Sequence, residues 1–139
     1  MMNYKFKMEK VLEYKSNVEK NKVEDYARMS TRLSQETEHL LTLEDELKER
    51  TREKVTDINA MKMQFLYKEK LKTEVQHQKS RVEEVSQKTN VARDVLIEAR
   101  KDRKIMEMLK DKDKERHHRE MLLQEQKELD DLTIMRFAK

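Results

Sequence analysis

The side chains in this sequence best suited to proton transfer or metal binding are its histidines, because an imidazole can do either near neutral pH. There are four of them: His39, His77, His117 and His118. His117 and His118 are adjacent, so on a helix they point to different faces and are poorly placed to share a ligand. His118 with Glu115 only weakly resembles the His and Glu spacing of metal sites in helical bundles. We therefore expect no metal and no cofactor.

Two further kinds of chemistry are excluded by residues that the sequence lacks. None of the 139 residues is a cysteine, so the chain has no thiolate nucleophile, no disulfide and no sulfur ligand for a metal. None is a glycine, so a phosphate-binding P-loop cannot form. Because no catalytic set of residues is present, the sequence predicts a protein that is not an enzyme.

The absence of glycine and proline also predicts the fold class, since these residues make most tight turns and end most helices. A globular domain of this length would hold about ten glycines at average usage. Charged residues make up 44% of the chain and hydrophobic residues 35%, with 32 Lys and Arg against 29 Asp and Glu. This mixture favours a coiled coil. Complete disorder is the alternative, but the net charge of +3 is low for an unfolded chain.

Apolar residues recur at alternating spacings of three and four, which is the pattern of a helix with one buried face. The first half carries Tyr4, Met8, Val11, Val18, Tyr26, Leu33, Leu40 and Leu47. The second half carries Val75, Gln78, Val82, Val85, Thr89, Ala92, Leu96, Ala99, Arg103 and Met106. Between them, the run from Thr56 to Asn59 is rich in residues that cap helices, with Asp57 or Asn59 as the cap. We predict helix 1 over about 2–56, a turn at about 56–60 and helix 2 over about 60–137.

Folding the chain at this turn brings apolar residues of the two halves face to face. Leu47 then meets Leu71, and Leu43 meets Val75. The further pairs are Leu33 with Val85, Tyr26 with Ala92, Val18 with Ala99, Val11 with Met106, and Met8 with Leu109. The prediction is an all-α fold: a long antiparallel two-helix coiled coil, an α-hairpin, forming a single domain over residues 1–139. Three polar positions in the apolar rows are candidates for fixing the register: Lys22, Thr37 and Gln78.

The C-terminal residues have no partner in this hairpin. Residues 121–139, here called the C-terminal overhang, contain Met121, Leu122, Leu123, Leu129, Leu132, Ile134, Met135 and Phe137. On a helix, Leu122, Leu129 and Leu132 lie on one face. An apolar stripe without a partner in its own chain indicates a partner protein. Pairing within a homodimer, or fraying of the helix end, are the alternatives.

Charge is unevenly distributed along the chain. Basic residues gather between Arg100 and Arg119, which the hairpin places beside the basic N-terminus, and acidic residues gather between Glu36 and Glu49. A basic end can bind nucleic acid, but acidic residues dilute this one and no aromatic side chains are interleaved for base stacking. An acidic protein partner is the preferred interpretation, and a solvated helix face is the alternative. We expect no nucleic acid partner.

No stretch of the sequence approaches the ~20 apolar residues that cross a membrane. The first residues also lack the apolar core of a secretory signal. We therefore expect a cytoplasmic protein without direct membrane insertion.

Two groups of segments resemble the family of the flagellar export protein FliJ. The first group is Tyr4–Lys15 with Val23–Arg28, and the second is Ala99–Lys110 with Glu125–Asp130 and Arg136–Phe137. The resemblance covers essentially the whole chain, in order, spacing and total length. It implies a long antiparallel coiled coil similar to the rotor stalk of rotary ATPases.

The resemblance also implies a function in the flagellar type III protein export apparatus. Members of this family insert into the pore of the hexameric export ATPase FliI and promote its assembly and activity. They contact the cytoplasmic part of the export gate FlhA and bind export chaperones. Such a protein would be monomeric when free, and peripherally associated with the apparatus at the inner face of the cell membrane.

Site residues follow from the same resemblance. The open end of the hairpin would enter the ATPase, and its candidate contacts are Tyr4, Phe6, Leu122, Leu129, Leu132 and Phe137. The gate would contact both helices toward the turn, where Leu47, Tyr67 and Leu71 keep the apolar or aromatic character of the family. Arg50, Lys54 and Glu74 depart from that character.

Two other functions fit the same fold class. One is the equivalent stalk of a virulence-type III secretion system. The other is a structural coiled-coil tether, which predicts a continuous parallel dimer with no break near Thr56–Asn59.

Overall fold

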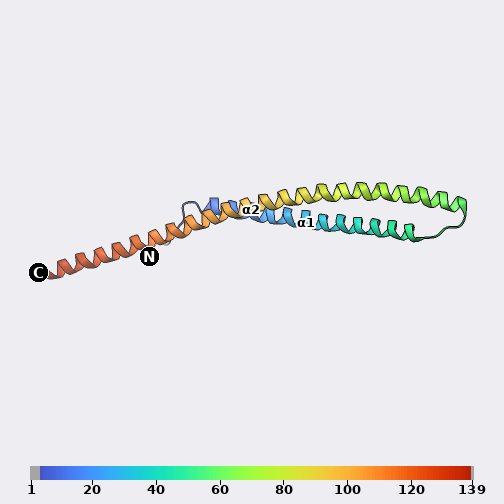
Figure 1. The fold of residues 1–139 in the computed structure, drawn as a ribbon. Coiled ribbons are helices and arrows are strands. Elements are labelled where there is room, and N and C mark those ends of the chain that lie inside the picture. Colours follow the sequence, from blue (N-terminus) through green and yellow to red (C-terminus); the bar gives the residue numbers. More distant parts are fainter. Residues whose placement is uncertain (1–3, 139) are drawn as a thin grey trace. The chain divides into compact units, whose positions relative to one another are not determined.

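The computed structural model describes residues 4–138. They form two long helices, α1 over Glu9–Arg52 and α2 over Ile58–Phe137, joined by residues 53–57 (Figure 1). The two helices pack against each other, and these residues contain no strand. The structure is an all-α helical hairpin, which confirms the predicted fold class.

Helix α1 begins later than the expected residue 2. The segment Tyr4–Met8, here called the N-terminal segment, is not helical. The carbonyl of Met8 accepts the amide of Leu12 at 3.0 Å, so the helical hydrogen bonds begin from Met8. Met8 has no side-chain oxygen to cap the first amides of a helix, and nothing in the segment favours an earlier start. The N-terminal segment therefore lies along α2 in a non-helical conformation.

The turn also differs from the expected 56–60, because α1 ends at Arg52 and the turn occupies residues 53–57. Asp57 directly precedes α2, and its carbonyl accepts the amide of Met61 at 2.8 Å. Asp57 is thus the N-cap residue, one of the two that the sequence offered. No described residue has a positive φ. The turn is therefore built without the left-handed residue that usually follows a helix and favours glycine.

The packing divides into two compact units. The turn unit comprises Asn21–Ile97, and the terminal unit comprises Met1–Lys20 with Glu98–Lys139. In the turn unit, a core cluster joins Leu43 of α1 to Leu71 and Val75 of α2, and the partly buried Leu40, Leu47 and Tyr67 pack against it. This cluster contains the predicted pairs Leu47 with Leu71 and Leu43 with Val75.

Two buried polar residues link the helices of the turn unit. The Nε2 of Gln78 donates to the Glu36 carbonyl at 2.9 Å and to its Oε2 at 2.6 Å. The Thr89 hydroxyl lies 2.8 Å from the Val85 carbonyl and 3.3 Å from the Met29 carbonyl of α1. A buried amide that needs a partner at one height along α1 fixes the register. Of the three polar positions considered from the sequence, only Gln78 is buried; Thr37 is exposed and bonds within its own helix, and Lys22 is half-buried.

The terminal unit combines a small apolar core with ion pairs between its helices. Leu12, Ala99 and Met106 are buried. Glu19 of α1 pairs with both Arg100 and Arg103 of α2. Two further pairs, listed from the end of the unit inward, are Glu9 with Lys110 at 2.9 Å and Lys15 with Asp102 at 3.8 Å. Much of the basic charge after Arg100 is therefore matched by carboxylates, which leaves less of it for an external anion.

Candidate functional site

The most exposed apolar residues of the terminal unit lie in the C-terminal overhang. Every side chain from 122 to 138 is exposed, and Figure 1 shows no second helix beside this end of α2. Leu122 is 51% exposed, Leu129 59% and Leu132 62%. Because α2 stays helical to Phe137, these three leucines do lie on one helical face. The overhang therefore presents a leucine stripe without a partner in the described chain.

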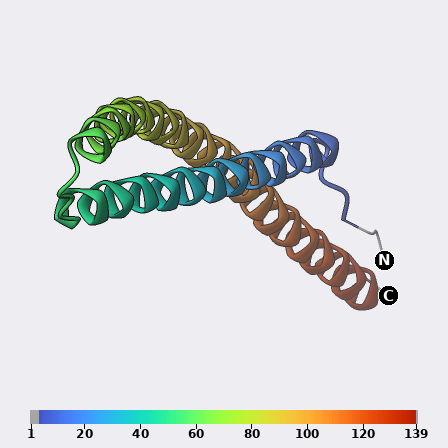
Figure 2. The same cartoon turned by 90° about the vertical axis from the view of Figure 1, so that its right-hand side faces the viewer.

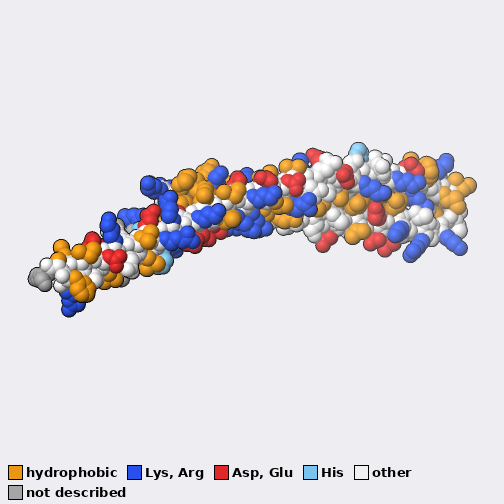
Figure 3. Space-filling model, turned by 60° about the vertical axis from the view of Figure 1, so that its left-hand side comes forward, with side chains coloured by type: hydrophobic (Ala, Val, Ile, Leu, Met, Phe, Trp, Pro, Cys, Tyr) orange, Lys and Arg blue, Asp and Glu red, His pale blue; other side chains and the backbone are white. Residues whose placement is uncertain are grey.

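The overhang carries further exposed apolar side chains on other faces. They are Leu123, Ile134, Met135 and Phe137. Figure 2 shows the ribbon of this end of α2, and Figure 3 shows hydrophobic side chains among charged ones along it. Such a helix can be surrounded by a partner that covers several of its faces at once.

The N-terminal segment lies against α2 through Tyr4. The Tyr4 hydroxyl donates to Oδ2 of Asp113 at 2.8 Å, and the Tyr4 ring lies 5.4 Å from the ring of His117, centroid to centroid. Burial, and next the hydrogen bond to Asp113, raise the pKa of Tyr4 to about 12. Tyr4 is therefore held within the chain and is not a free contact residue like the overhang leucines.

A groove of about 560 Å³ separates the N-terminal segment from α2. Its lining includes Tyr4, Phe6 and Met8 on one side and Leu109 and His117 on the other. Phe6 is half-buried there. The six predicted open-end residues thus fall into two groups: Tyr4 and Phe6 line this groove, whereas Leu122, Leu129, Leu132 and Phe137 are exposed farther along α2.

The predicted gate-contact residues near the turn differ in accessibility. Leu71 is only 3% exposed, because it packs between the helices in the core cluster. Leu71 thus pairs the two helices, as the predicted contact with Leu47 requires, and a partner reaches its side chain only if the helices separate. Leu47 and Tyr67 are half-buried at the margin of the cluster and remain partly accessible.

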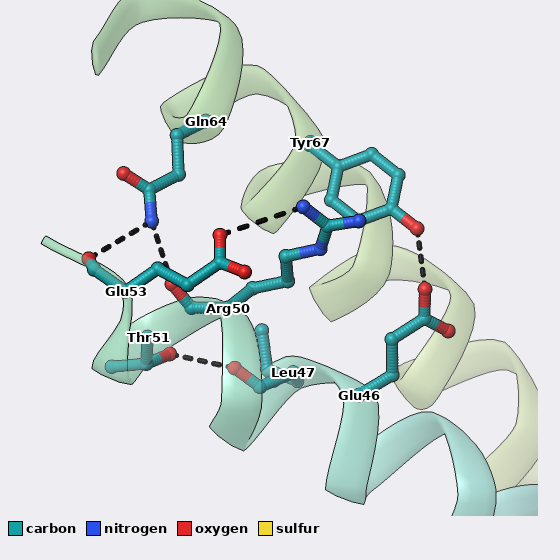
Figure 4. A network of polar contacts seen from close by, with 7 residues as sticks. All are labelled: Glu46, Leu47, Arg50, Thr51, Glu53, Gln64 and Tyr67. Atoms are coloured by element: carbon teal, nitrogen blue, oxygen red, sulfur yellow. Dashed lines mark hydrogen bonds and ion pairs between the residues drawn. The ribbon is translucent and has the colours of Figure 1, made fainter. Parts of the chain in front are cut away.

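Tyr67 is held by charged side chains of α1, as Figure 4 shows. Its hydroxyl donates to Glu46, and this hydrogen bond, followed by burial, raises the pKa of Tyr67. The guanidinium carbon of Arg50 lies 4.7 Å from the centroid of the Tyr67 ring, within the range of a cation–π interaction. Arg50 also pairs with Glu53 at 3.5 Å. Arg50 therefore covers one face of the aromatic ring.

The sequence model of the family described as Flagellar FliJ protein matches residues 4–139, which is essentially the whole chain. The chain belongs to the FliJ family. No curated protein and no solved structure matches it. Family membership associates the protein with flagellar type III export and agrees with its helical hairpin.

The described part of this FliJ-family protein lacks the features that a metal site or a membrane span requires. Within residues 4–138, no three His, Cys, Asp or Glu side chains come together as they would around a metal ion. In the same part of the chain, neither helix has a segment both long enough and apolar enough to cross a membrane. The arrangement is suited to binding through exposed side chains.

Sequence reasoning missed two features of the FliJ hairpin, both at the turn. One is Gln64, whose side chain bonds the carbonyl of Arg50 in the last turn of α1 and the carbonyl of Glu53 in the connection (Figure 4). The other is an exposed apolar patch formed by Ile58, Met61, Phe65 and Leu66. The spacing of these residues was visible in the sequence. The patch was missed because it lies on the face of α2 opposite the one that pairs with α1, and the prediction of the hairpin followed the pairing face.

Proposed function

We propose that this FliJ-family protein is a non-enzymatic stalk of the flagellar export apparatus. Its C-terminal overhang enters the pore of the hexameric ATPase FliI, promotes assembly of the ring and raises its ATP turnover. The mechanism is binding: an apolar helix inside the ring gives the subunits a common surface to assemble around. The protein is monomeric when free.

The observation that carries this proposal is the exposed leucine stripe at the end of a well-packed hairpin. Leu122, Leu129 and Leu132 are each at least half exposed. Moving such a side chain from water into a protein interface contributes about 1.5–3 kcal/mol. Three leucines on one face therefore supply about 4.5–9 kcal/mol in total. This is of the same order as the entropy cost of association, so the neighbouring apolar side chains of the overhang contribute to the affinity as well.

We further propose that the turn unit contacts the cytoplasmic part of the export gate FlhA. Leu47 and Tyr67 are the proposed contact residues, while Leu71 supports them from the core. Arg50 must move off the Tyr67 ring, or be included in the contact, when a partner binds that face. Export chaperones are proposed as further partners, with the protein held at the inner face of the cell membrane through the apparatus.

The proposal is tested by titrating the purified protein into its cognate FliI and measuring ATP turnover, with ring formation followed by electron microscopy. We expect stimulation of turnover and more rings. A chain that ends at residue 120 should lose both effects and keep its hairpin, because the deleted residues make no described contact with α1. Absence of any effect with the folded full-length chain would reject the ATPase proposal.

Three substitutions locate the contact. Phe137→Ala and Leu132→Ala alter the overhang, whereas Phe6→Ala alters the groove beside the N-terminal segment. Loss of stimulation in the first two alone supports entry of the overhang. Loss in Phe6→Ala alone would place the contact at the groove instead.

A further inference from the structure

The first turns of α2 are apolar on two opposite faces. One face, with Tyr67 and Leu71, packs toward α1. On the other face lies the outer patch, formed by Ile58, Met61, Phe65 and Leu66. Three of these side chains are more than 60% exposed: Ile58 at 69%, Phe65 at 62% and Leu66 at 63%. An apolar helix face is normally covered by another part of the protein or by a partner. The face toward α1 is covered in this way, whereas nothing in the described chain covers the outer patch.

The outer patch is an open surface on one helix. Its residues and Lys62 are the only ones that line it, and all of them come from the first turns of α2. Figure 3 shows hydrophobic side chains gathered at the end of the turn unit where the chain reverses. The patch has no second wall, so it does not form a groove that could hold a peptide. It suits a binding surface into which its side chains can insert.

The sequence on both sides of the outer patch is basic. Residues 48–72 contain eight cations, listed in order as Lys48, Arg50, Arg52, Lys54, Lys62, Lys68, Lys70 and Lys72. The same residues contain four carboxylates, Glu49, Glu53, Asp57 and Glu69. Among residues 4–138, ion pairs involve only Arg50 and Lys72 of these cations. The other six therefore have no carboxylate within ion-pair distance and are available to an anionic surface.

We propose that the outer patch binds the surface of an anionic lipid bilayer. Phe65, Leu66, Ile58 and Met61 enter the boundary between headgroups and acyl chains, as the apolar faces of interfacial helices do. Lys62 extends its amine from the middle of the patch toward the headgroups. The cations around the turn strengthen this binding through the negative surface potential of the bilayer. Nothing spans the membrane, and the binding is weak and reversible.

A second copy of the chain is a less suitable occupant. A stable interface buries about 800 Å² on each partner, whereas the outer patch consists of four side chains on one helix. Two copies meeting through these patches would also bring their unpaired lysines close together, which is repulsive. A bilayer has neither limitation, since it is continuous and carries the opposite charge.

This inference does not depend on the proposed role at FliI. The overhang proposed to enter FliI belongs to the terminal unit, whereas the outer patch belongs to the turn unit. The proposed gate contacts Leu47 and Tyr67 pack against the core cluster between the helices and are not part of the outer patch. Failure of the ATPase experiment would therefore leave the lipid proposal standing, and failure of the lipid experiment would leave the ATPase proposal standing.

The chain has no tryptophan, so a single one reports its own surroundings without interference. We would place it at the outer patch with Phe65→Trp and, as a matched control, in the overhang with Leu129→Trp. Each full-length variant is mixed with vesicles of phosphatidylcholine alone or with added phosphatidylglycerol. We expect the emission of the first variant to shift to shorter wavelength with the anionic vesicles only, and the control to change less.

Substitutions then separate the two contributions to binding, measured by vesicle sedimentation. Leu66→Ser should weaken binding about tenfold or more, because a leucine is lost from the apolar boundary. Lys62→Glu should weaken it to a similar degree and remove part of its salt dependence. Both residues are exposed and outside the core, so circular dichroism should show an unchanged helix content.

Three results would overturn the proposal. One is absence of binding to anionic vesicles by the folded protein. Another is equal binding to neutral vesicles, which would remove the role of charge. The third is loss of vesicle binding only when the overhang is altered. Concentration-dependent association through the patch without lipid would instead identify a second copy as its occupant.

Discussion

The side-chain amide of Gln64 donates to the backbone carbonyl of Arg50 at 2.7 Å, so a residue of α2 closes the C-terminal end of α1. The same nitrogen lies 3.2 Å from the carbonyl of Glu53. The last carbonyls of a helix have no partner within it, and a glycine-based turn usually supplies their hydrogen bonds. This chain has no glycine, and Gln64 provides one of these hydrogen bonds from the facing helix, to Arg50.

Removal of this amide should destabilise the hairpin near the turn. We expect Gln64→Ala to lower the free energy of unfolding by about 1 kcal/mol, the usual net contribution of a hydrogen bond whose partner stays accessible to water. Urea unfolding followed by circular dichroism measures the change. The control is Gln76→Ala, which truncates an exposed glutamine of the same helix. Equal effects of both substitutions would show that the cap has no special role.

Leu71→Ala distinguishes a core residue from a contact residue. Because Leu71 is buried in the cluster with Leu43 and Val75, its truncation should cost about 2–5 kcal/mol of stability. Phe65→Ala, which truncates an exposed side chain of the outer patch, should change stability by less than about 0.5 kcal/mol. Thermal unfolding of the two variants checks the difference. A small effect of Leu71→Ala would argue against the packing described here.

Glu36 should make part of the stability depend on pH. The hydrogen bond from Gln78, and secondarily the charge of Arg81, hold the pKa of the Glu36 carboxyl below its ordinary value of 4.5, against the opposing effect of burial. Because the pKa of Glu36 is lower in the folded state than in the unfolded state, its ionisation stabilises the fold, and this stabilisation is complete above the unfolded-state pKa. The contribution is lost as the pH falls from 4.5 through the folded pKa.

The test of this dependence compares the native chain with Glu36→Gln. The native chain should be the more stable at neutral pH, and the difference should shrink as the pH is lowered below 4.5. In a Gln78→Leu background the difference should be smaller at every pH, since the main cause of the pKa shift is absent. A difference that does not vary with pH would contradict this assignment.

Tyr4 should ionise later than an ordinary tyrosine. Its pKa is raised from 10.0 to about 12, so the contact with Asp113 contributes fully below pH 10 and is lost as the pH rises toward 12. The ultraviolet absorbance of tyrosinate, followed during alkaline titration, should contain a late component that Tyr4→Phe reduces; the remainder belongs to Tyr67, whose pKa is also raised. Tyr14→Phe, an exposed control, should keep it. An unchanged late component in Tyr4→Phe would assign it elsewhere.

The pairing of the helices could be predicted from the sequence because it depends on a repeat. Each apolar row has the helical period, and one choice of turn brings the rows together, as the cluster of Leu43, Leu71 and Val75 confirms. The unpaired overhang followed from the same register. The predicted helix 2 is longer than helix 1, so its last residues extend past the start of helix 1 and have no partner.

The remaining features depend on individual contacts that no repeat encodes. The position of the turn is stabilised by Gln64, which belongs to α2 and bonds the end of α1 only once the chain has reversed. The N-terminal segment departs from helix because Tyr4 finds Asp113 and His117 on α2. The burial of Leu71 followed from the pairing of the apolar rows, whereas the resemblance gave only its apolar character and not the direction in which the side chain points.

The leucine stripe of the overhang provides the sharpest prediction about function. Leu129→Ala and Leu132→Ala should each weaken binding to the FliI ring about tenfold or more, because each removes apolar area from one shared face. Leu123→Ala is the matched control, since Leu123 is even more exposed, at 70%, but lies on another face of the helix. All three variants should unfold at the same temperature, because none of these side chains is part of the core. Binding measured by fluorescence anisotropy should therefore separate the first two from the third. If all three lose affinity alike, the ring surrounds the whole helix; if none does, the stripe is not the contact.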